Sequence, residues 1–421
     1  MSGGYKRYLL FILAIVLAFN LVDRLALGLV LQSVKADLGL NDTQLGFLTG
    51  IAFAFFYATM GIPLARWADR GNRIALISIT TALWSVAVAL CGAVNSFLQM
   101  LTVRIAVAVG EAGTMPAAQS LIADHFERAR RPKATAVFML GGPLGVIIGY
   151  MAAGWLDQMF GWRMMFVLLA LPGLVLAVLV GLTLREPRTL VRGGGQRVEH
   201  EQTISVCIDL LRGRSFRHLL IGFSVLQFFN YGILQWQPTF FIRTHDLGTG
   251  TLGAWFGLIY GVGGLIGTHL GGEIASRWAS RDERLQLRVV AAAFVLFGVA
   301  KALLFIVPDY HAALAFLSFA VVGGAMANAP LFATLQTLVP ENRRATAVAL
   351  ILFSANLIGM GLGPVAIGVL SDWLMPSLGG DSLRYALALL CPGFLWSALH
   401  VWLAGRTIRV EIENVDGSRD L

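Results

Sequence analysis

Long apolar stretches alternate with short charged segments along the whole chain. A helix that crosses a bilayer needs about 20 mostly apolar residues. The pattern therefore predicts an all-α polytopic membrane protein with twelve membrane-spanning helices, at 8–34, 43–65, 74–95, 97–123, 133–156, 163–184, 215–242, 249–276, 287–307, 311–337, 345–371 and 383–405.

Composition supports this interpretation. Hydrophobic residues make up 57% of the chain and charged residues 13%, whereas soluble domains carry about 25% charged residues. The first apolar run, Tyr8 to Leu31, is too long for the core of a signal peptide and lacks a small-residue cleavage site. The three cysteines are far apart, without metal or redox spacing. We therefore expect free thiols, no metal and no other cofactor.

Most of the 32 basic residues fall in alternate loops, as in Arg66, Arg70 and Arg73, or in Arg128, Arg130, Arg131 and Lys133. Loops rich in Lys and Arg face the cytoplasm, which predicts a cell (inner) membrane protein with both termini cytoplasmic. The net charge of +8 is then a topology signal, and we expect no nucleic acid partner.

The chain divides into two halves of six spans. Residues 185–214 are polar and Gly-rich, typical of a linker, which predicts one half at 1–184 and another at 215–421. Lys133-Ala-Thr-Ala-Val137 recurs as Arg344-Ala-Thr-Ala-Val348, each opening the fifth span of its half. Two halves of the same orientation imply parallel repeats related by an axis along the membrane normal.

Several motifs resemble a known family. Ala65-Arg-Trp-Ala-Asp-Arg-Gly-Asn-Arg73 resembles the major facilitator signature between spans 2 and 3, departing from it at Ala65, Trp67 and Asn72. The segments Asn20-Leu-Val-Asp-Arg24 and Arg104…Gly110-Glu-Ala112 resemble Spinster-type lipid transporters. Anion–cation symporters of the same superfamily also begin with an Asn-x-x-Asp-Arg segment.

The resemblance implies the major facilitator fold and transport by alternating access. Spinster members move lysophospholipids or sphingosine-1-phosphate-like lipids, and the resemblance implies proton coupling for bacterial members. Asp23, Arg104 and Glu111 match the membrane-embedded charged positions of that family.

The charges in spans 1 and 4 are also unusual on physical grounds. An ionised side chain at the bilayer centre costs at least about 2.5–3.5 kcal/mol, and such residues usually line ion or substrate pathways. Asp23 and Arg104 lie at similar depths, so they can pair if spans 1 and 4 adjoin. Glu111 shares a helix face with Arg104, about 10 Å along the axis.

These positions suggest a site hypothesis. Burial favours a protonated carboxyl group and a nearby guanidinium favours the charged form, so Glu111, with Asp23, is predicted to couple protons. Arg104 is predicted to hold the anionic substrate, or Asp23 when substrate is absent. The alternative is a structural ion pair that fixes packing.

The other intramembrane cations have simpler interpretations. Arg24 is expected to snorkel or form a structural pair, because it points away from Asp23, and Lys301 is expected to snorkel from near a span end. The second half otherwise offers mostly neutral groups to a cavity. We predict substrate contacts, in addition to those of Asp23, Arg104 and Glu111, from Asn230, Tyr231, Gln235 and Asn356.

Two further features suggest moving parts. Gly141, Gly145 and Gly149 in span 5, and Gly263, Gly267 and Gly271 in span 8, allow close helix packing. They form either a sliding interface between the halves or packing contacts within each half. In the loop signature, Asp69, Arg70 and Arg73 are predicted to gate the cytoplasmic side, the alternative being solvated loop charges.

A proton-linked transporter of an anionic amphiphile, working as a monomer among membrane lipids, is thus the preferred hypothesis. The runner-up moves small organic anions or drugs. A lipid enzyme or a sensor is disfavoured, because no catalytic residues and no added soluble domain are visible. Direct ATP coupling is also disfavoured, because no P-loop lysine motif occurs.

Overall fold

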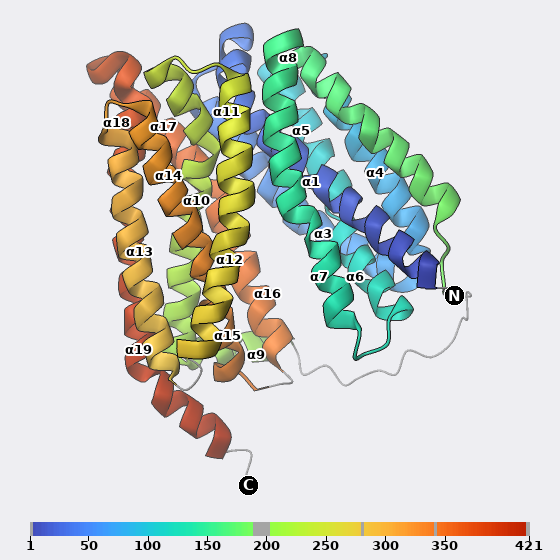
Figure 1. Ribbon diagram of the computed structural model, residues 1–421, viewed down its shortest axis with the longest axis vertical. Coiled ribbons are helices and arrows are strands. Elements are labelled where there is room, and N and C mark those ends of the chain that lie inside the picture. Colours follow the sequence, from blue (N-terminus) through green and yellow to red (C-terminus); the bar gives the residue numbers. More distant parts are fainter. Residues whose placement is uncertain (1–2, 188–202, 279–281, 341–342, 418–421) are drawn as a thin grey trace.

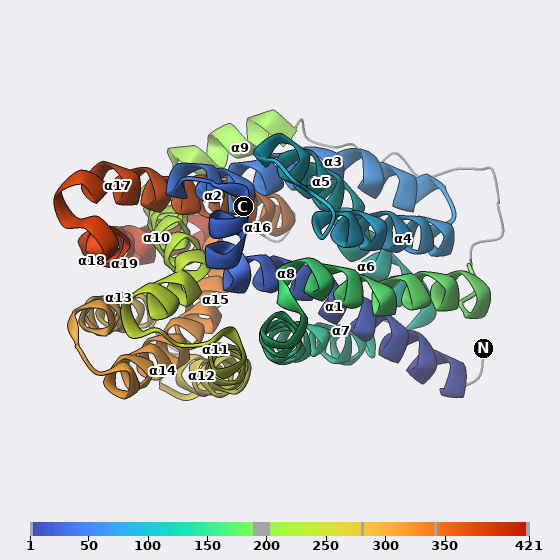
Figure 2. The ribbon, with the colours of Figure 1, turned by 90° about the horizontal axis from the view of Figure 1, so that it is seen from above.

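The computed structural model describes all residues except 1–2, 188–202, 279–281, 341–342 and 418–421. This part of the chain is helical and forms two bundles that stand side by side (Figures 1 and 2). The first bundle contains α1 (Gly3–Leu38), α2 (Asp42–Thr49), α3 (Ile51–Arg70), α4 (Arg73–Cys91), α5 (Phe97–Glu111), α6 (Thr114–His125), α7 (Arg131–Met139) and α8 (Gly141–Thr183).

The second bundle is interrupted more often. Its α-helices are α9 (Thr203–Arg212), α10 (Arg214–His245), α11 (Thr249–Phe256), α12 (Gly263–Glu273), α13 (Glu283–Ile306), α14 (Tyr310–Met326), α15 (Asn328–Leu338), α16 (Arg344–Ser354), α17 (Gly363–Leu378), α18 (Ser382–Leu390) and α19 (Gly393–Gly417). Between them lie the π-helical segments η1 (Gly257–Val262), η2 (Ile274–Trp278) and η4 (Ala355–Leu362), and the 3₁₀ turn η5 (Gly379–Asp381).

Within the described residues, nine helical stretches are long and apolar enough to cross a membrane. Two of these, Arg131–Thr183 and Thr346–Ile412, have 53 and 67 residues, and each is long enough for two crossings. Predicted span 97–123 is divided between α5 and α6, each shorter than a crossing. The arrangement is consistent with twelve crossings.

Local sequence explains where several helices begin and turn. Asn41 forms a capping box with Gln44 at the start of α2, and the Ser96 side chain accepts from the backbone of Gln99 at the start of α5. Gly161 lies inside α8 at φ +77°, where a residue with a side chain would be strained. This glycine turns the chain between predicted spans 133–156 and 163–184.

A break in span 4 places Glu111 at a helix end. α5 ends at Glu111, and α6 begins at Thr114. Predicted span 97–123 is therefore not one continuous helix. The break sits beside Trp84 of α4, because a Cβ at Gly110 would lie 2.7 Å from Trp84 Cβ.

The halves meet chiefly toward one end of the molecule, which we call the Asp42 end; it lies at the top of Figure 1, opposite the C-terminus. There, α2 of the first half lies over the second half and packs against α17 (Figure 2). The α8–α11 and α1–α10 pairs also join the halves. Buried apolar residues of both halves form one continuous core, and a second core serves the other end of the second half.

The predicted linker 185–214 is only partly described, since residues 188–202 lie outside the described residues. Its described part includes α9, which packs against α10 and α16. At least this section of the segment is therefore helical and bound to the second half.

Candidate functional site

Two ion pairs lie side by side between α1 and α5. Arg104 Nη1 donates to Asp23 Oδ2 over 3.1 Å. Arg24 Nε donates to Glu111 Oε2 over 2.7 Å, and Arg24 Nη2 bonds the same oxygen. The two carboxyl groups lie near each other. We call Asp23, Arg24, Arg104 and Glu111 the charged cluster; with both acids ionised it is electrically neutral.

The charged cluster is buried, and its members differ in access. The exposed fraction of the side chain is 0% for Glu111, 4% for Asp23 and 2% for Arg104, but 17% for Arg24. Asp23 Oδ1 and Glu111 Oε1 have no hydrogen-bond partner among the described residues. An unsatisfied buried group costs about 1–3 kcal/mol, and a proton on one carboxyl group would give the other a donor.

Two aromatic rings of α3 support the cationic half of the cluster. The Arg24 guanidinium lies 4.4 Å from the centre of the Phe53 ring and 4.7 Å from that of Tyr57. Arg104 lies 5.3 Å from the same Phe53 ring. Cation–π contacts of this kind contribute up to about 2 kcal/mol when desolvated, so the rings help to position both guanidinium groups.

The predicted Asp23–Arg104 pair is confirmed, and of the two alternatives expected for Arg24 the structure shows the ion pair. Arg24 does not snorkel: it forms the ion pair with Glu111. Asp23 and Arg24 are neighbours on α1 and point in different directions, and Arg104 and Glu111 lie about two turns apart on α5. Asp23 therefore meets one position of α5 and Arg24 the other. The partner of Glu111 is Arg24, and Arg104 pairs with Asp23.

A cavity of about 350 Å³ lies in the second half, between α10, η1, α12, α13 and α14. Asn230 and Tyr231, both predicted to contact substrate, line it, together with Tyr260 and Asn328. Phe294, Phe297 and Phe394 supply apolar walls. We call this space the Lys301 cavity.

Lys301 does not snorkel, contrary to prediction. Its side chain is buried, lines this cavity and donates from Nζ to Asn230 Oδ1 over 2.6 Å. The ammonium also lies 4.9 Å from the centre of the Phe394 ring. The prediction failed because α13 packs against α19 and turns Lys301 inward, where it reaches Asn230 of α10, and not toward the membrane surface.

The remaining two predicted substrate contacts lie elsewhere. Gln235 abuts α1, since a Cβ at Gly28 would lie 2.6 Å from Gln235 Oε1. Asn356 lies half-buried in η4. Neither residue lines the Lys301 cavity. Gln235 is thus placed at the junction of the halves.

The loop signature forms contacts within the first half. Arg73 is buried and pairs with Asp124 at 2.7 Å and with Glu186, and it donates to the Ser120 carbonyl oxygen over 3.0 Å. Arg73 is thus a buried, paired residue and not a solvated loop charge. Asp69 and Arg70 are exposed, and gating by Asp69, Arg70 and Arg73 stays a prediction.

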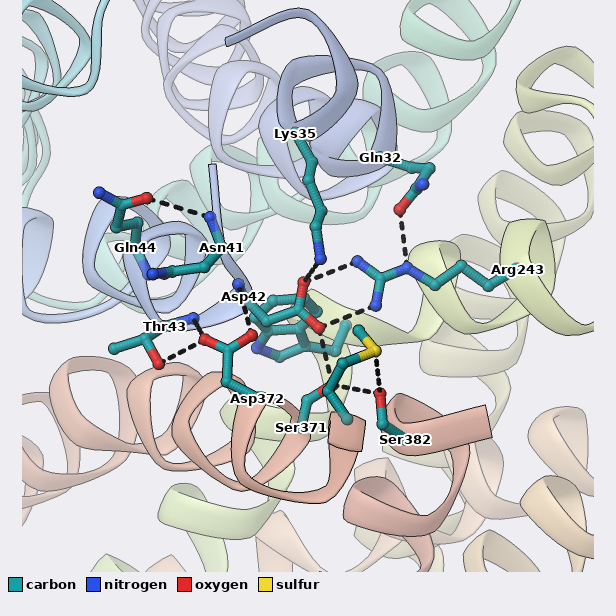
Figure 3. Close-up of polar contacts among 12 residues, drawn as sticks. Gln32, Lys35, Asn41, Asp42, Thr43, Gln44, Arg243, Ser371, Asp372 and Ser382 are labelled. Atoms are coloured by element: carbon teal, nitrogen blue, oxygen red, sulfur yellow. Dashed lines mark hydrogen bonds and ion pairs between the residues drawn. The ribbon is translucent and has the colours of Figure 1, made fainter. Parts of the chain in front are cut away.

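A polar network that the sequence analysis did not find joins the halves at the Asp42 end (Figure 3). The buried Asp42 carboxylate accepts from Lys35 over 2.6 Å and from two nitrogens of Arg243 over 2.7 and 2.8 Å. Ser371 of α17 donates to it over 2.7 Å. The available signal was an acid at the start of span 2 and basic residues at the ends of spans 1 and 7.

Asp372 completes this network from the second half. Its carboxylate accepts the backbone N–H groups of Asp42 and Thr43 over 3.0 and 2.7 Å (Figure 3). Side chains that accept such groups cap a helix start, so a residue of α17 caps α2 of the other half. We call Lys35, Asp42, Arg243, Ser371 and Asp372 the Asp42 network.

The glycine ladders pack within the halves, so the sliding-interface interpretation is wrong. A Cβ at Gly145 would lie 2.8 Å from Ala18 Cα of α1, and one at Gly271 would lie 3.0 Å from Met326 Cα of α14. One close approach between the halves involves Gly154 and Gly253 instead: a Cβ at Gly154 would lie 3.0 Å from Gly253 Cα.

No group of three or more His, Cys, Asp or Glu side chains in the described part is arranged to hold a metal ion. The cysteines are free thiols, with Cys91 and Cys391 buried. The chemistry that this site offers is ion pairing, proton binding and hydrogen bonding.

Comparison with characterised sequences gives related transporters. The chain is 35% identical over 402 residues to an MFS-type efflux pump of Mycolicibacterium smegmatis, across 95% of this chain and 93% of that protein. It is 27% identical to protein spinster homolog 1 of Xenopus tropicalis, across 87% and 74%. It is 26% identical to the probable galactarate/D-glucarate transporter GudP of Bacillus subtilis, across 57% and 58%.

Comparison with solved structures agrees. A bacterial homolog of the human lysosomal transporter Spinster, in an inward-facing and unoccupied conformation, matches with a TM-score of 0.88 and 26% identity, across 98% of this chain and 99% of that one. Its inward-facing and occupied conformation matches with a TM-score of 0.81. The Major Facilitator Superfamily profile matches residues 13–364. The protein is therefore a membrane-embedded transporter and not an enzyme, and it resembles the Spinster-type members. The chain belongs to the Major Facilitator Superfamily.

Proposed function

We propose that this protein is a proton-coupled secondary transporter of an anionic amphiphile, such as a lysophospholipid or a sphingosine-1-phosphate-like lipid. It works by alternating access, as a monomer in the cell (inner) membrane, with both termini in the cytoplasm. Its Spinster-type relatives and the excess of basic residues in alternate loops support this assignment.

The Arg24–Glu111 pair carries the proposal. Glu111 is fully buried and Arg24 is the most accessible member of the charged cluster. A proton bound to Glu111 removes the negative charge that holds Arg24. The guanidinium is then free to bind a carboxylate or phosphate group, which it recognises well through its planar donors. Asp23 keeps Arg104 paired throughout, so the exchange of proton and substrate takes place at Arg24.

Alternating access supplies the second step. In the orientation proposed here, the Asp42 end faces outward, and the Asp42 network closes it. The conformation is then inward-open, in keeping with the inward-facing Spinster homolog that the chain resembles. The reverse conformation requires Asp42 to leave Arg243 and Ser371.

Small organic anions are the second candidate cargo. The identity with a probable galactarate/D-glucarate transporter favours them, as does the small Lys301 cavity, which lies near the lower limit of about 300 Å³ for ligand pockets. The charged cluster performs the same exchange with either cargo.

The test is uptake by the purified protein in liposomes. We expect a labelled lysophospholipid to move faster when a proton gradient is imposed. Glu111→Gln keeps a hydrogen-bond acceptor for Arg24 but cannot exchange a proton, so we expect it to reduce gradient-driven uptake at least about tenfold, within the range that a positioned proton-transfer group contributes. Asp309→Asn, at an exposed helix cap, is the matched control and should behave like wild type.

The outcomes separate coupling from cargo. Lipid uptake that ignores both the gradient and Glu111→Gln would contradict proton coupling and leave the lipid cargo standing. If labelled galactarate is taken up and the lipid is not, the assigned cargo changes from the amphiphile to small organic anions. No uptake of either by a folded protein would overturn both cargo assignments.

A further inference from the structure

The Lys301 cavity contains a positive charge that no carboxylate balances. Lysine and arginine side chains are buried at only three described positions: Arg73, Arg104 and Lys301. The first two contact carboxylates, whereas Lys301 contacts none among the described residues. We infer that Lys301 is the charge partner of a carboxylate or phosphate group on the transported molecule. The inference deepens the proposed function and rests on it.

The ammonium has unused binding capacity. It has three N–H donors, and the structure assigns one of them, to Asn230 Oδ1. Its other close neighbour is the neutral ring of Phe394. Because an unpaired cation is costly in hydrocarbon and usually marks a substrate path, an anion in the cavity has a strong electrostatic advantage over a neutral or cationic molecule.

The residues that line the cavity suit a ligand that carries one anionic group next to an apolar part. The amide of Asn328 and the hydroxyl of Tyr231 stand near the same space and provide further hydrogen bonds. Phenylalanine rings supply apolar parts of the wall. At about 350 Å³, the cavity has room for a head group, or for a small organic acid, and an acyl chain has to extend beyond it.

The cavity also adjoins the charged cluster. Tyr231 lines it and lies near Arg24. Lys301 and Arg24 thus approach one path from opposite halves. An anion released from one cation can be taken by the other, and a molecule with two anionic groups can contact both. Lys301 therefore adds a cation to the mostly neutral groups that the second half was expected to offer.

Equilibrium binding tests the inference without a proton gradient. We would measure dissociation constants of the full chain in detergent by calorimetry for lysophosphatidic acid, for galactarate, and for a monoacylglycerol with the same acyl chain. Lys301→Gln should weaken binding of whichever anion binds wild type at least tenfold and leave the monoacylglycerol unchanged. Lys301→Arg should retain part of the affinity, and Lys133→Gln, at an exposed lysine, should retain all of it.

Thermal unfolding separates binding from packing. If Lys301 is kept for an anion, Lys301→Gln removes a buried unpaired charge and should melt no lower than wild type. Unchanged anion affinity in Lys301→Gln, an equal loss for the neutral monoacylglycerol, or a wild type that binds neither anion would overturn the inference. Binding of lysophosphatidic acid alone identifies a lipid source, and binding of galactarate alone a water-soluble one. A failure of gradient-driven uptake with Lys301-dependent binding intact would count only against the proton coupling.

Discussion

At the residue scale, Arg24 is held by contacts of two kinds. Glu111 neutralises its charge through two hydrogen bonds to one oxygen, and Phe53 and Tyr57 support the plane of the guanidinium. The ionic contact depends on the proton carried by Glu111, whereas the ring contacts do not. Loss of the ionic contact therefore leaves Arg24 stacked on α3 and still positioned to meet a ligand.

A double-mutant cycle measures this pairing. Arg24→Gln leaves Glu111 buried without its partner, and breaking a buried ion pair costs about 3–5 kcal/mol. We expect the Arg24→Gln/Glu111→Gln double variant to recover at least about 1 kcal/mol of that loss, because contacting residues couple by about 0.5–3 kcal/mol. Denaturant unfolding in detergent gives the values.

The control for this cycle is an exposed ion pair. Arg212→Gln removes a surface contact with Asp209 and should cost less than about 1 kcal/mol. Strictly additive losses for Arg24→Gln and Glu111→Gln would show that the two side chains are not coupled.

At the scale of elements, the halves touch through backbone where α8 meets α11. A Cβ at Gly154 would overlap the Thr249 carbonyl oxygen, and a Cβ at Gly253 would overlap that of Tyr150. Backbone atoms cannot move aside as a flexible side chain can. These two glycines therefore allow the two halves to approach closely near the Asp42 end.

Gly154→Ala should shift the protein toward opening at the Asp42 end. Overpacking of this kind costs about 1–3 kcal/mol in the closed conformation. Spin labels at the exposed positions Met159 on α8 and Thr251 on α11 report the separation by pulsed electron resonance. We expect a larger fraction of molecules to show a longer distance between the two spin labels.

Gly142→Ala on α8 is the matched control, because nothing lies within 4 Å of a Cβ at that position. Gly142→Ala gains the same helix propensity as Gly154→Ala, about 0.5–1 kcal/mol, but its added methyl group overlaps no other atom. An identical distance distribution in the two variants would rule out a role for Gly154 in closing this end.

At the scale of the whole molecule, the Asp42 network joins the two halves with several charge-assisted contacts. Asp42 belongs to the first half and lies between Lys35 of its own half and Arg243 of the other. Asp372 caps α2 across the same boundary. The network is buried at its centre, so each contact depends on the others.

Asp42→Asn should favour the conformation that is open at this end. The substitution removes the anion and leaves two cations facing each other, and loss of one partner from a buried hydrogen-bonded charge pair costs about 2–5 kcal/mol. A shift of about 3 kcal/mol changes the population ratio roughly 100-fold. The same spin-label pair measures it. Asp309→Asn, at an exposed cap within the second half, should leave the distances unchanged.

The sequence predicted most of the fold because apolar stretches of bilayer length are a strong signal. Similar depth in the membrane also indicated the Asp23–Arg104 pair, on condition that spans 1 and 4 adjoin. The sequence missed the Arg24–Glu111 pair and the buried setting of Lys301, because both depend on which helix faces pack together. The Asp42 network joins residues 42 and 371, and no local pattern relates positions so far apart in the chain.

The balance of charge between the two halves has a consequence for energetics in a polarised membrane. The charged cluster is neutral, whereas Lys301 leaves the empty protein with one positive charge near its centre. In the loaded protein a monoanion contributes one negative charge and the proton on Glu111 one positive charge, so the single positive charge of the empty protein is retained. Moving a full elementary charge across 100 mV is worth about 2.3 kcal/mol, and a partial movement is worth a proportionate share. The membrane voltage therefore acts equally on the empty protein and on the protein loaded with a proton and a monoanion. With a dianionic cargo the loaded protein is neutral, and the voltage then acts only on the return of the empty protein.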